Sequence, residues 1–449
     1  MEYIKREIDK SLAAWKNAAQ HKPLLLRGAR RVGKSSSVRE LGKQFEYFLE
    51  INFENNEYTE AKKVFEQSLS YKMIADALYT MFGISLEAGK TLLFLDEIQS
   101  CADAISALRF FYEEMPELHV IVADSFLEFD LEELPSYDVD RITLRFMYPL
   151  SFSEYLGALK MEHLSEAIKA ASSENPLSED LHHTALKHLI NHIAIGGMPE
   201  VVAAYAQGGT LAECMLILDS LMRSYYDDFA KYQQKISPSL LRRTLKSIAK
   251  QTGNRFNYSE ILREVRYETL KQSVEWLVFA GLAYPLNMTG GNGLPLGAEI
   301  NQKFCRFLIF DTGVMLRILG ENISDILLAE KFEQINKGNV VELFVGLELL
   351  KNAPPNLAGE LYYWLRNIRN SHAQVDFLIQ KNSKIVPIEV KSGTTGKMQS
   401  LNLFMKEKQS LYGIRTSLEN FAEYNKIKVY PLYAIGILAN YELRIAANP

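Results

Sequence analysis

The residues from Gly28 to Ser35 match the complete phosphate-binding pattern G-x-x-x-x-G-K-S. The two glycines allow backbone N–H groups to converge on phosphate oxygens, and a helix that follows adds the positive end of its dipole. Lys34 would reach the β- and γ-phosphates of a nucleotide, and the Ser35 hydroxyl would ligate Mg²⁺. The pattern therefore predicts a nucleotide-phosphate site made by Gly28, Ala29, Arg30, Arg31, Val32, Gly33, Lys34, Ser35 and Ser36.

The residues around this loop provide the strand and the helix that the pattern requires. Pro23–Leu26 is a short apolar run that predicts a buried strand before the loop. After the loop, Val38, Leu41 and Phe45 recur at helical spacing. The alternative is a glycine-rich turn that binds nothing, and the strand–loop–helix context disfavours it.

A second acidic motif lies where a nucleotide site would need it. The apolar run Thr91–Leu95 predicts a strand that ends in Asp96 and Glu97, with Asp96 62 residues after Lys34. Asp96 could hold Mg²⁺, commonly through water, and Glu97 could polarise the attacking water. The alternative is an acidic cap on a helix that starts near Ala104. The phosphate-binding loop favours the nucleotide site over that cap.

The composition is that of a globular chain with a large core. The chain has 449 residues, 47% hydrophobic and 23% charged, and this length predicts about two to four domains. The N-terminus is charged and no run could span a bilayer, so we expect a cytoplasmic protein without membrane contact. Cys101, Cys214 and Cys305 are expected to be buried thiols. The net charge of −5 argues against nucleic-acid affinity over the whole surface.

The order of apolar runs predicts an α/β chain built from four segments. In residues 1–160 strands alternate with helices, which is typical of a parallel sheet covered by helices on both faces. These strands are expected at Leu24–Leu26, Tyr47–Asn52, Thr91–Leu95, His119–Val122 and Ile142–Arg145. Residues 161–236 are mainly helical, with clear periodicity at His182–Ile195 and Leu211–Tyr232. Residues 237–325 and 326–449 follow as two further segments.

Residues 237–325 have the pattern of a winged helix-turn-helix module. Three helices are expected within Ser237–Tyr284, followed by a wing strand at Leu282–Leu286 and a wing tip at Thr289–Gly297. Ser237–Lys271 contains eight basic and three acidic residues, a local excess of five positive charges. Such a face could contact DNA phosphates. The alternative is a solvated face on a module that packs domains together.

Residues 326–449 hold a second group of candidate residues. A helix and three strands are expected at Asn339–Leu350, Leu361–Leu365, Val375–Gln380 and Ile385–Val390. A hairpin with its tip after Asn382 places Asp376 opposite Glu389, and Lys391 lies on the same face as Glu389. The two carboxylates can hold a divalent cation, Lys391 can steady a phosphorane charge, and Glu342 could supply a third oxygen ligand from the helix. The alternative is a solvated ion cluster at a strand end, which would stabilise little.

These motifs together resemble a large prokaryotic family of AAA-type ATPases. They occur in the order Arg27–Ser36, Leu93–Gln99, Arg141–Leu156, Gly196–Glu200 and Val375–Gly393. The resemblance covers nearly the whole chain, and this order is more specific than any single motif. It implies an AAA-like P-loop core, a helical lid and a winged helix. It also implies a C-terminal domain similar to PD-(D/E)xK nucleases, with a restriction-endonuclease-like fold.

The resemblance also assigns roles to residues. Nucleotide binding and hydrolysis carry over to Gly28, Gly33, Lys34, Ser35, Asp96 and Glu97. Arg141 resembles the family arginine best placed to touch a γ-phosphate, in its own subunit or in a neighbour, and Arg145 is the fallback on the same strand face.

The chain departs from the family pattern in three places. Asp124, followed by Ser125, stands where a polar uncharged residue would orient the attacking water. Asp140 replaces the glycine before Arg141, and Gln374 replaces an acid that often precedes Asp376. These departures predict slow hydrolysis and one ligand fewer in the nuclease-like site.

The sequence thus predicts a protein that binds ATP or ADP with Mg²⁺ and hydrolyses ATP. Adenine is implied by the resemblance, and the chain has no guanine-reading Asn-Lys-x-Asp motif. Two classes compete for the C-terminal region. It either cuts nucleic acid with Mg²⁺ at Asp376 and Glu389, or it keeps the fold without the chemistry and serves as an ATP-dependent switch for DNA or a protein partner.

Overall fold

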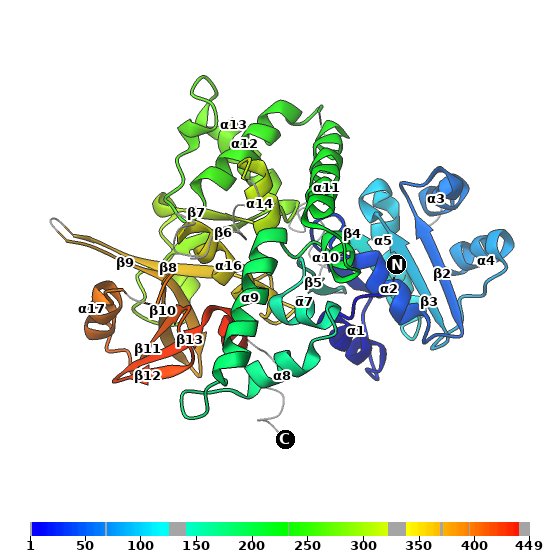
Figure 1. The fold of residues 1–449 in the computed structure, drawn as a ribbon. Coiled ribbons are helices and arrows are strands. Elements are labelled where there is room, and N and C mark those ends of the chain that lie inside the picture. Colours follow the sequence, from blue (N-terminus) through cyan, green and yellow to red (C-terminus); the bar gives the residue numbers. More distant parts are fainter. Residues whose placement is uncertain are drawn as a thin grey trace. The chain divides into compact units, whose positions relative to one another are not determined.

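The computed structural model describes residues 2–67, 70–124, 141–231, 233–321, 338–368, 371–394 and 396–439. These residues form two compact units. The N-terminal unit comprises Met1–Tyr148 with two short additions, Phe279–Gly281 and Pro355–Ala358. The second unit holds the rest of the chain, and its elements run from green to red in Figure 1.

The N-terminal unit is built on a five-stranded parallel sheet in the order β2-β3-β4-β1-β5. Its strands are β1 (Leu24–Arg27), β2 (Tyr47–Asn52), β3 (Thr91–Asp96), β4 (His119–Asp124) and β5 (Thr143–Phe146). All five strand predictions are confirmed to within two residues. Every residue of β3 and β4 is buried, because helices cover both faces of these central strands.

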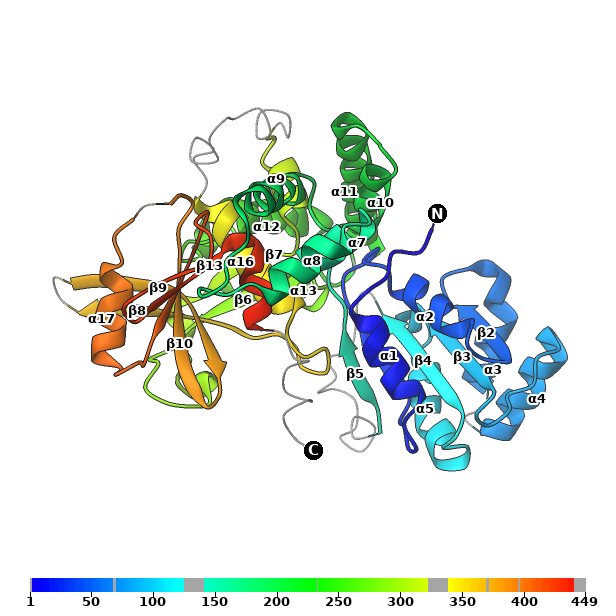
Figure 2. The ribbon, with the colours of Figure 1, turned by 60° about the horizontal axis from the view of Figure 1, so that its bottom comes forward.

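Helices cover the two faces of this sheet in separate groups. On one face, α3 (Thr59–Gln67), α4 (Tyr71–Phe82) and α5 (Ala102–Glu114) pack with one another and share a core with the strands. The helix α2 (Lys34–Gly42) also packs against the strands, and it contacts α1 (Ile8–Lys16). Figure 2 shows β2, β3 and β4 side by side with these helices around them. The arrangement leaves the carboxyl ends of the strands to hold the phosphate-binding loop.

The second unit begins with a run of helices. The predicted helices at His182–Ile195 and Leu211–Tyr232 are confirmed as α9 and α11, with Tyr232 outside the described residues. The bounds are α7 (Phe152–Ala158), α8 (Glu162–Ala170), α9 (Glu179–Ile195), α10 (Pro199–Ala206), α11 (Leu211–Lys231), α12 (Pro238–Gln251), α13 (Tyr267–Phe279) and α14 (Thr312–Ile318).

The Gly-Gly-Met-Pro-Glu motif has a structural role in this unit. The Asp311 carboxylate is fully buried, and it accepts the Gly197 N–H at 2.7 Å and the Val314 N–H at 3.0 Å. Gly196 has φ +77°, and a Cβ there would lie 2.1 Å from a carboxylate oxygen of Asp311. The motif therefore ties the end of α9 to the start of α14.

An eight-stranded sheet forms the rest of the second unit, in the order β12-β13-β11-β10-β9-β8-β6-β7. Its strands are β6 (Ala283–Met288), β7 (Arg306–Ile309), β8 (Leu361–Ile368), β9 (Ser371–Lys381), β10 (Lys384–Val390), β11 (Gly413–Ser417), β12 (Ala422–Tyr424) and β13 (Ile427–Pro431). The helices α16 (Gly338–Lys351) and α17 (Gln399–Glu407) pack against it. The predicted helix and strands between residues 339 and 390 are confirmed.

The structure differs here from the predicted division at residue 325. Strand β6 of the winged-helix segment pairs in parallel with β8, so one sheet runs through both segments. The second of the three helices expected within Ser237–Tyr284 is a single 3-10 turn, η3 (Tyr258–Glu260). The order is therefore α12, η3, α13 and the antiparallel hairpin of β6 and β7.

Candidate nucleotide site and carboxylate cluster

The phosphate-binding loop leaves the carboxyl end of β1 and enters α2 at Lys34. Gly33 has φ +103°, a left-handed conformation that glycine adopts without strain. At Gly28 a Cβ would lie 2.1 Å from the carbonyl oxygen of Met147, so no side chain fits there. The two glycines of the pattern are thus required by backbone conformation and by close approach.

The Lys34 side chain lies folded over the loop that contains it. Its Nζ donates to the carbonyl oxygens of Gly28 at 2.8 Å and Ala29 at 3.0 Å. Burial lowers the pKa of Lys34, and the nearby Glu97 and Asp124 carboxylates oppose that shift. Phosphate oxygens could take over the two carbonyl contacts and would add the charge that a buried ammonium needs.

Ser35 and Asp96 lie together, as the predicted metal role requires. The Ser35 hydroxyl donates to Asp96 Oδ2 at 2.8 Å. Burial raises the pKa of Asp96, and the hydrogen bond from Ser35 works in the opposite direction. A hydroxyl and a carboxylate are oxygen ligands of the kind Mg²⁺ prefers. These two residues therefore fit a magnesium site beside the loop.

Glu97 adopts a backbone conformation that is rare outside glycine. Its φ is +53°, and its N–H donates to Asp96 Oδ1 at 3.1 Å. The Gln99 amide donates to the Glu97 carboxylate at 2.6 Å and orients it. Strained backbone of this kind clusters at functional sites. Glu97 is not a cap of α5, because the 3-10 turn η2 (Ile98–Ser100) separates it from that helix.

Asp124 belongs to the same group of carboxylates. It ends β4, is 3% exposed, and lies opposite Arg27 in the sheet register. Its negative charge opposes the lowering of the Lys34 pKa by burial, so the Asp124 and Lys34 side chains interact electrostatically. The predicted departure at this position thus lies in the site. Ser125 and Asp140 lie outside the described residues.

The remaining residues of the loop make contacts within the N-terminal unit. Arg30 forms an ion pair with Glu54 at 2.9 Å, and Arg31 has φ +63°. The buried Arg6 donates to the carbonyl oxygens of Val32 at 2.8 Å and Tyr148 at 2.7 Å. Arg6, near the N-terminus, thus stabilises the loop, and no sequence pattern around Arg6 predicts that role.

Arg141 lies at the wrong end of the sheet for the predicted contact within its own subunit. Thr143 pairs with Leu24 at the start of β1, and Phe146 pairs with Arg27 beside the loop. Arg141 precedes Thr143, so it lies beyond the amino ends of the parallel strands. There it forms an ion pair with Glu113 at 2.8 Å. Arg145 donates to the Ser11 hydroxyl at 2.7 Å and so packs against α1.

We expect Arg141→Ala to leave ATP affinity and turnover of the monomer unchanged. The ion pair with Glu113 is partly exposed, at 27% and 37% for the two side chains, so its loss should cost at most about 1 kcal/mol of stability. Calorimetric ATP titration and thermal unfolding check both expectations. If Arg141→Ala hydrolyses ATP more slowly than the wild type only at high protein concentration, Arg141 acts in the site of a neighbouring subunit.

The C-terminal hairpin has the predicted register. Its tip is the two-residue turn of Asn382 and Ser383, both with positive φ, at 49° and 56°. Phe377 pairs with Ile388, which makes Asp376 and Glu389 the next facing pair. The Val390 N–H donates to Asp376 Oδ2 at 2.8 Å. The two predicted carboxylates therefore lie side by side.

The structure brings Lys391 and Glu342 to the same cluster. Lys391 Nζ donates to Glu389 Oε1 at 2.7 Å. Burial, followed by the charge of Asp376, raises the pKa values of both Glu342 and Glu389. Glu348, on the same helix, accepts the Phe152 N–H at 3.1 Å. Glu342 is therefore the glutamate of this helix that lies near Asp376 and Glu389.

Arg306 is the member of the cluster that the sequence did not reveal. It starts β7 and is 5% exposed. Its guanidinium forms an ion pair with Glu342 at 3.3 Å, donates to the Gln374 side-chain oxygen, and lies 4.1 Å from the centre of the Tyr363 ring. Across the described parts of the chain, no three His, Cys, Asp or Glu side chains are placed to hold a metal ion.

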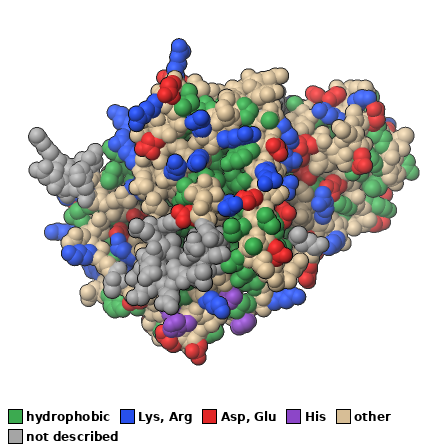
Figure 3. Space-filling view, turned by 45° about the horizontal axis from the view of Figure 1, so that its top comes forward, with side chains coloured by type: hydrophobic (Ala, Val, Ile, Leu, Met, Phe, Trp, Pro, Cys, Tyr) green, Lys and Arg blue, Asp and Glu red, His purple; other side chains and the backbone are tan. Residues whose placement is uncertain are grey.

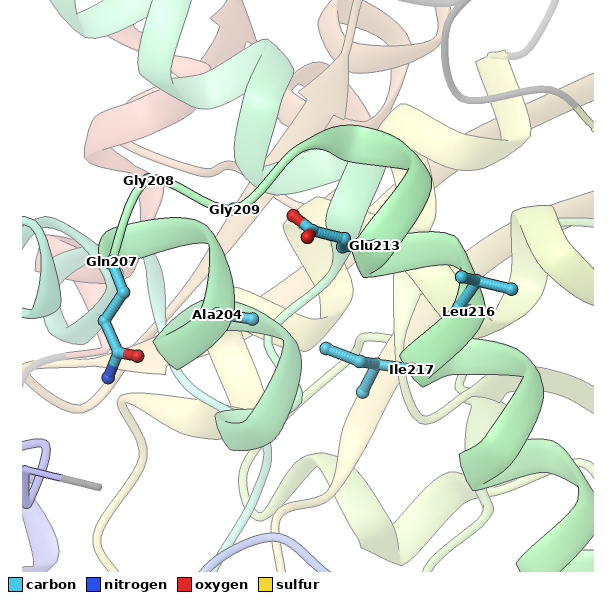
Figure 4. A pocket seen from close by; sticks show the side chains of 7 residues that line it. All are labelled: Ala204, Gln207, Gly208, Gly209, Glu213, Leu216 and Ile217. Carbon is cyan, nitrogen blue, oxygen red and sulfur yellow. The ribbon is translucent and has the colours of Figure 1, made fainter.

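A surface pocket of about 600 Å³ lies between the end of α10 and the start of α11 (Figure 4). It contains none of the predicted site residues. The carboxylate of Glu213 on its wall accepts the Thr210 N–H at 2.6 Å. This pocket is lined by Ala204, Gln207, Gly208, Gly209, Glu213, Leu216 and Ile217.

Comparison with protein families divides the chain into three matches. Residues 20–156 match the family described as AAA domain. This part of the chain, which holds the phosphate-binding loop, therefore resembles an AAA-type ATPase domain. Residues 186–325 match a domain of unknown function (DUF8612), and residues 337–435 match another (DUF4143). A comparison with curated proteins gives no match.

Solved structures with similarity to the chain include those of three proteins. Caenorhabditis elegans PCH-2 is 17% identical with TM-score 0.26, over 49% of this chain and 61% of its own. A Thermotoga maritima RuvB variant is 16% identical with TM-score 0.31, over 67% and 93%. The replication initiator DnaA bound to AMPPCP and single-stranded DNA is 14% identical with TM-score 0.28, over 62% and 89%. The chain thus matches about three fifths of PCH-2 and most of the other two.

Two further findings concern membrane-spanning helices and the cysteines. In the part of the chain that the structure describes, no helix is long and apolar enough to cross a membrane. Cys101, Cys214 and Cys305 are free thiols, and the first two are buried, as predicted.

Proposed function

We propose that this protein hydrolyses ATP with Mg²⁺ in the cytoplasm and couples its nucleotide state to the winged-helix and nuclease-like C-terminal region. The observation that carries the ATPase role is the hydrogen bond from Ser35 to Asp96 beside the Lys34 ammonium. Lys34 binds the phosphates, and Glu97 takes a proton from the attacking water. Mg²⁺ held by Ser35 and Asp96 would neutralise charge on the phosphates.

The coupling is supported by the turn between α13 and β6. This turn, Phe279–Gly281, belongs to the N-terminal unit, whereas α13 up to Val278 and all of β6 belong to the second. Gly281 has φ +69°, and a Cβ there would lie 3.0 Å from the backbone nitrogen of Ala29 in the phosphate-binding loop. The loop therefore approaches a turn from which the chain continues directly into β6, and this continuity of the chain is the proposed route of coupling.

The proposed partner of α12 and α13 is DNA. Their segment presents basic side chains, all exposed, and Figure 3 shows Lys and Arg gathered on this part of the molecule. Exposed cations of this kind bind phosphates without reading sequence. They are Arg242, Arg243, Lys246, Lys250, Arg255, Arg263, Arg266 and Lys271.

The second candidate function is an ATP-dependent switch whose nuclease-like region does not cut. Arg306 favours it, because a guanidinium already balances charge among the carboxylates. The alternative to this switch is a nuclease. In a nuclease, Asp376 and Glu389 would hold a metal ion and Lys391 would assist in cutting nucleic acid.

ATP turnover and plasmid integrity, measured together with and without Mg²⁺ and duplex DNA, test the proposed function. We expect DNA to change the turnover of the wild type. Gly281→Ala should weaken this response about tenfold, because alanine is strained at positive φ and crowds Ala29. The matched control is Gly89→Ala, with φ +70° and nothing within 4 Å of its Cβ.

The outcomes separate the two candidates. Plasmid that stays intact while DNA changes turnover supports the switch, and Mg²⁺-dependent cutting supports the nuclease. An equal response in Gly281→Ala and Gly89→Ala would exclude the turn as the coupling element. No ATP turnover under any condition would overturn the proposed function as a whole.

A further inference from the structure

We propose that Arg306 is the built-in cation of the C-terminal carboxylate cluster and takes the place that a divalent metal ion would need. The cluster is defined by Glu342, Asp376, Glu389 and Lys391. Arg306 enters it from β7, the strand farthest from β12 in the sheet order. The consequence is a cluster that excludes Mg²⁺ and Mn²⁺ in the wild-type protein.

The charges of the cluster are arranged around two internal cations. Lys391 contacts Glu389 at 2.7 Å, and Arg306 contacts Glu342 at 3.3 Å. The Asp376 carboxylate accepts hydrogen bonds from the Val390 N–H at 2.8 Å and from the Gln374 amide at 3.3 Å. Buried carboxylates without such partners would be strongly destabilising. Two positively charged side chains, Lys391 and Arg306, therefore balance charge among the three carboxylates, and no metal ion is needed for this.

Gln374 is suited to a cluster built around arginine. Its side-chain oxygen accepts from Arg306, and its amide donates to Asp376. An ionised acid at this position could accept from Arg306 but could not donate to Asp376. The glutamine thus links the arginine to the carboxylate, which gives a physical reason for the departure from an acid at this position.

Several contacts fix the guanidinium in place. One face lies over the Tyr363 ring at 4.1 Å, and the Tyr363 hydroxyl is itself held by the Phe304 carbonyl oxygen at 2.7 Å. Arg306 is 5% exposed. To leave the cluster, it would have to give up the ring, Glu342 and Gln374 together. A metal ion at millimolar concentration would not displace it.

One carboxylate oxygen is available once the arginine is gone. Glu389 is 7% exposed, and its Oε2 has no hydrogen-bond partner among the described residues. Of the two cations described above, replacing Arg306 with a neutral residue leaves Lys391 alone opposite three carboxylates. We therefore expect a cation site to appear in such a variant.

The experiment measures Mn²⁺ binding to the full-length, nucleotide-free protein by electron paramagnetic resonance and by thermal unfolding. The wild type and Asp376→Asn should bind Mn²⁺ equally weakly. Arg306→Gln, which keeps much of the volume, should unfold at lower temperature and bind Mn²⁺ at least tenfold more tightly. Mn²⁺ should restore part of its lost stability, and adding Asp376→Asn to this variant should abolish both gains.

Arg317→Ala is the matched control. Arg317 pairs with Asp219 at 2.6 and 2.8 Å in the same unit. Among the described residues, Asp219 is the one carboxylate that raises the pKa of Arg317, so Mn²⁺ should not rescue that variant. Wild-type Mn²⁺ binding that Asp376→Asn removes would overturn the proposal, and so would an Arg306→Gln protein that gains no Mn²⁺ affinity. If Arg306→Gln does not fold, the wild-type and Asp376→Asn titrations decide. None of these readouts uses ATP turnover, so they are independent of the nucleotide site.

Discussion

Replacing Lys34 with alanine is expected to weaken Mg²⁺-ATP binding by about 30- to 150-fold. The ammonium is buried beside the loop, where a charge-assisted contact to phosphate is worth about 2–3 kcal/mol. Its two hydrogen bonds are to the carbonyl oxygens of Gly28 and Ala29, so the substitution also removes two contacts that stabilise the loop. Isothermal titration calorimetry with ATP and with ADP measures the loss.

Lys43→Ala is the control for this substitution. Lys43 follows the same helix, is exposed, and pairs with Glu40 on the surface, so its loss should leave nucleotide affinity unchanged. Wild-type affinity in Lys34→Ala would show that the nucleotide binds elsewhere.

Glu97→Gln is expected to bind ATP as well as the wild type does and to hydrolyse it at least about 100-fold more slowly. The amide keeps the size of the side chain but cannot accept a proton from water, and a general base contributes about 10²–10⁴ in rate. The hydrogen bond between Ser35 and Asp96, which supports binding, is left intact. Single-turnover kinetics together with nucleotide titration separate the two effects.

The control for this second substitution is Glu87→Gln. Glu87 precedes β3 at the other end of the strand and pairs on the surface with Lys90 at 3.1 Å. If Glu97→Gln and Glu87→Gln hydrolyse ATP equally fast, Glu97 is not the base. Asp124, the other carboxylate near Lys34, is then the residue to change next.

The parts of the fold that depend on local pattern could be predicted from the sequence. The runs that became β1 to β5 are apolar because both faces of a parallel sheet are covered. The register of the β9–β10 hairpin followed from its two-residue turn and the alternation of side chains, and it placed Asp376 next to Glu389. Spacing along the chain was sufficient in both cases.

What the sequence did not reveal depends on contacts between distant segments. The position of Arg141 next to the fifth strand was predicted, but which end of the sheet it occupies follows from the pairing of β5 with β1. Arg306 is separated by 68 residues from its partner Gln374, and nothing in the run from Cys305 to Phe310 distinguishes it from an ordinary strand. The contact of Gly281 with the loop is of the same kind.

The shared sheet limits how the chain can be divided. Leu286, Asn287 and Met288 of β6 pair with Leu361, Tyr362 and Tyr363 of β8. A cut near residue 326 would remove β6 and β7 and leave β8 as a bare edge with unpaired backbone groups along an apolar strand. Such a fragment would be prone to aggregate, and Arg306 would be lost with the severed strands. A fragment that is to fold by itself must therefore contain both residues 237–325 and residues 326–449.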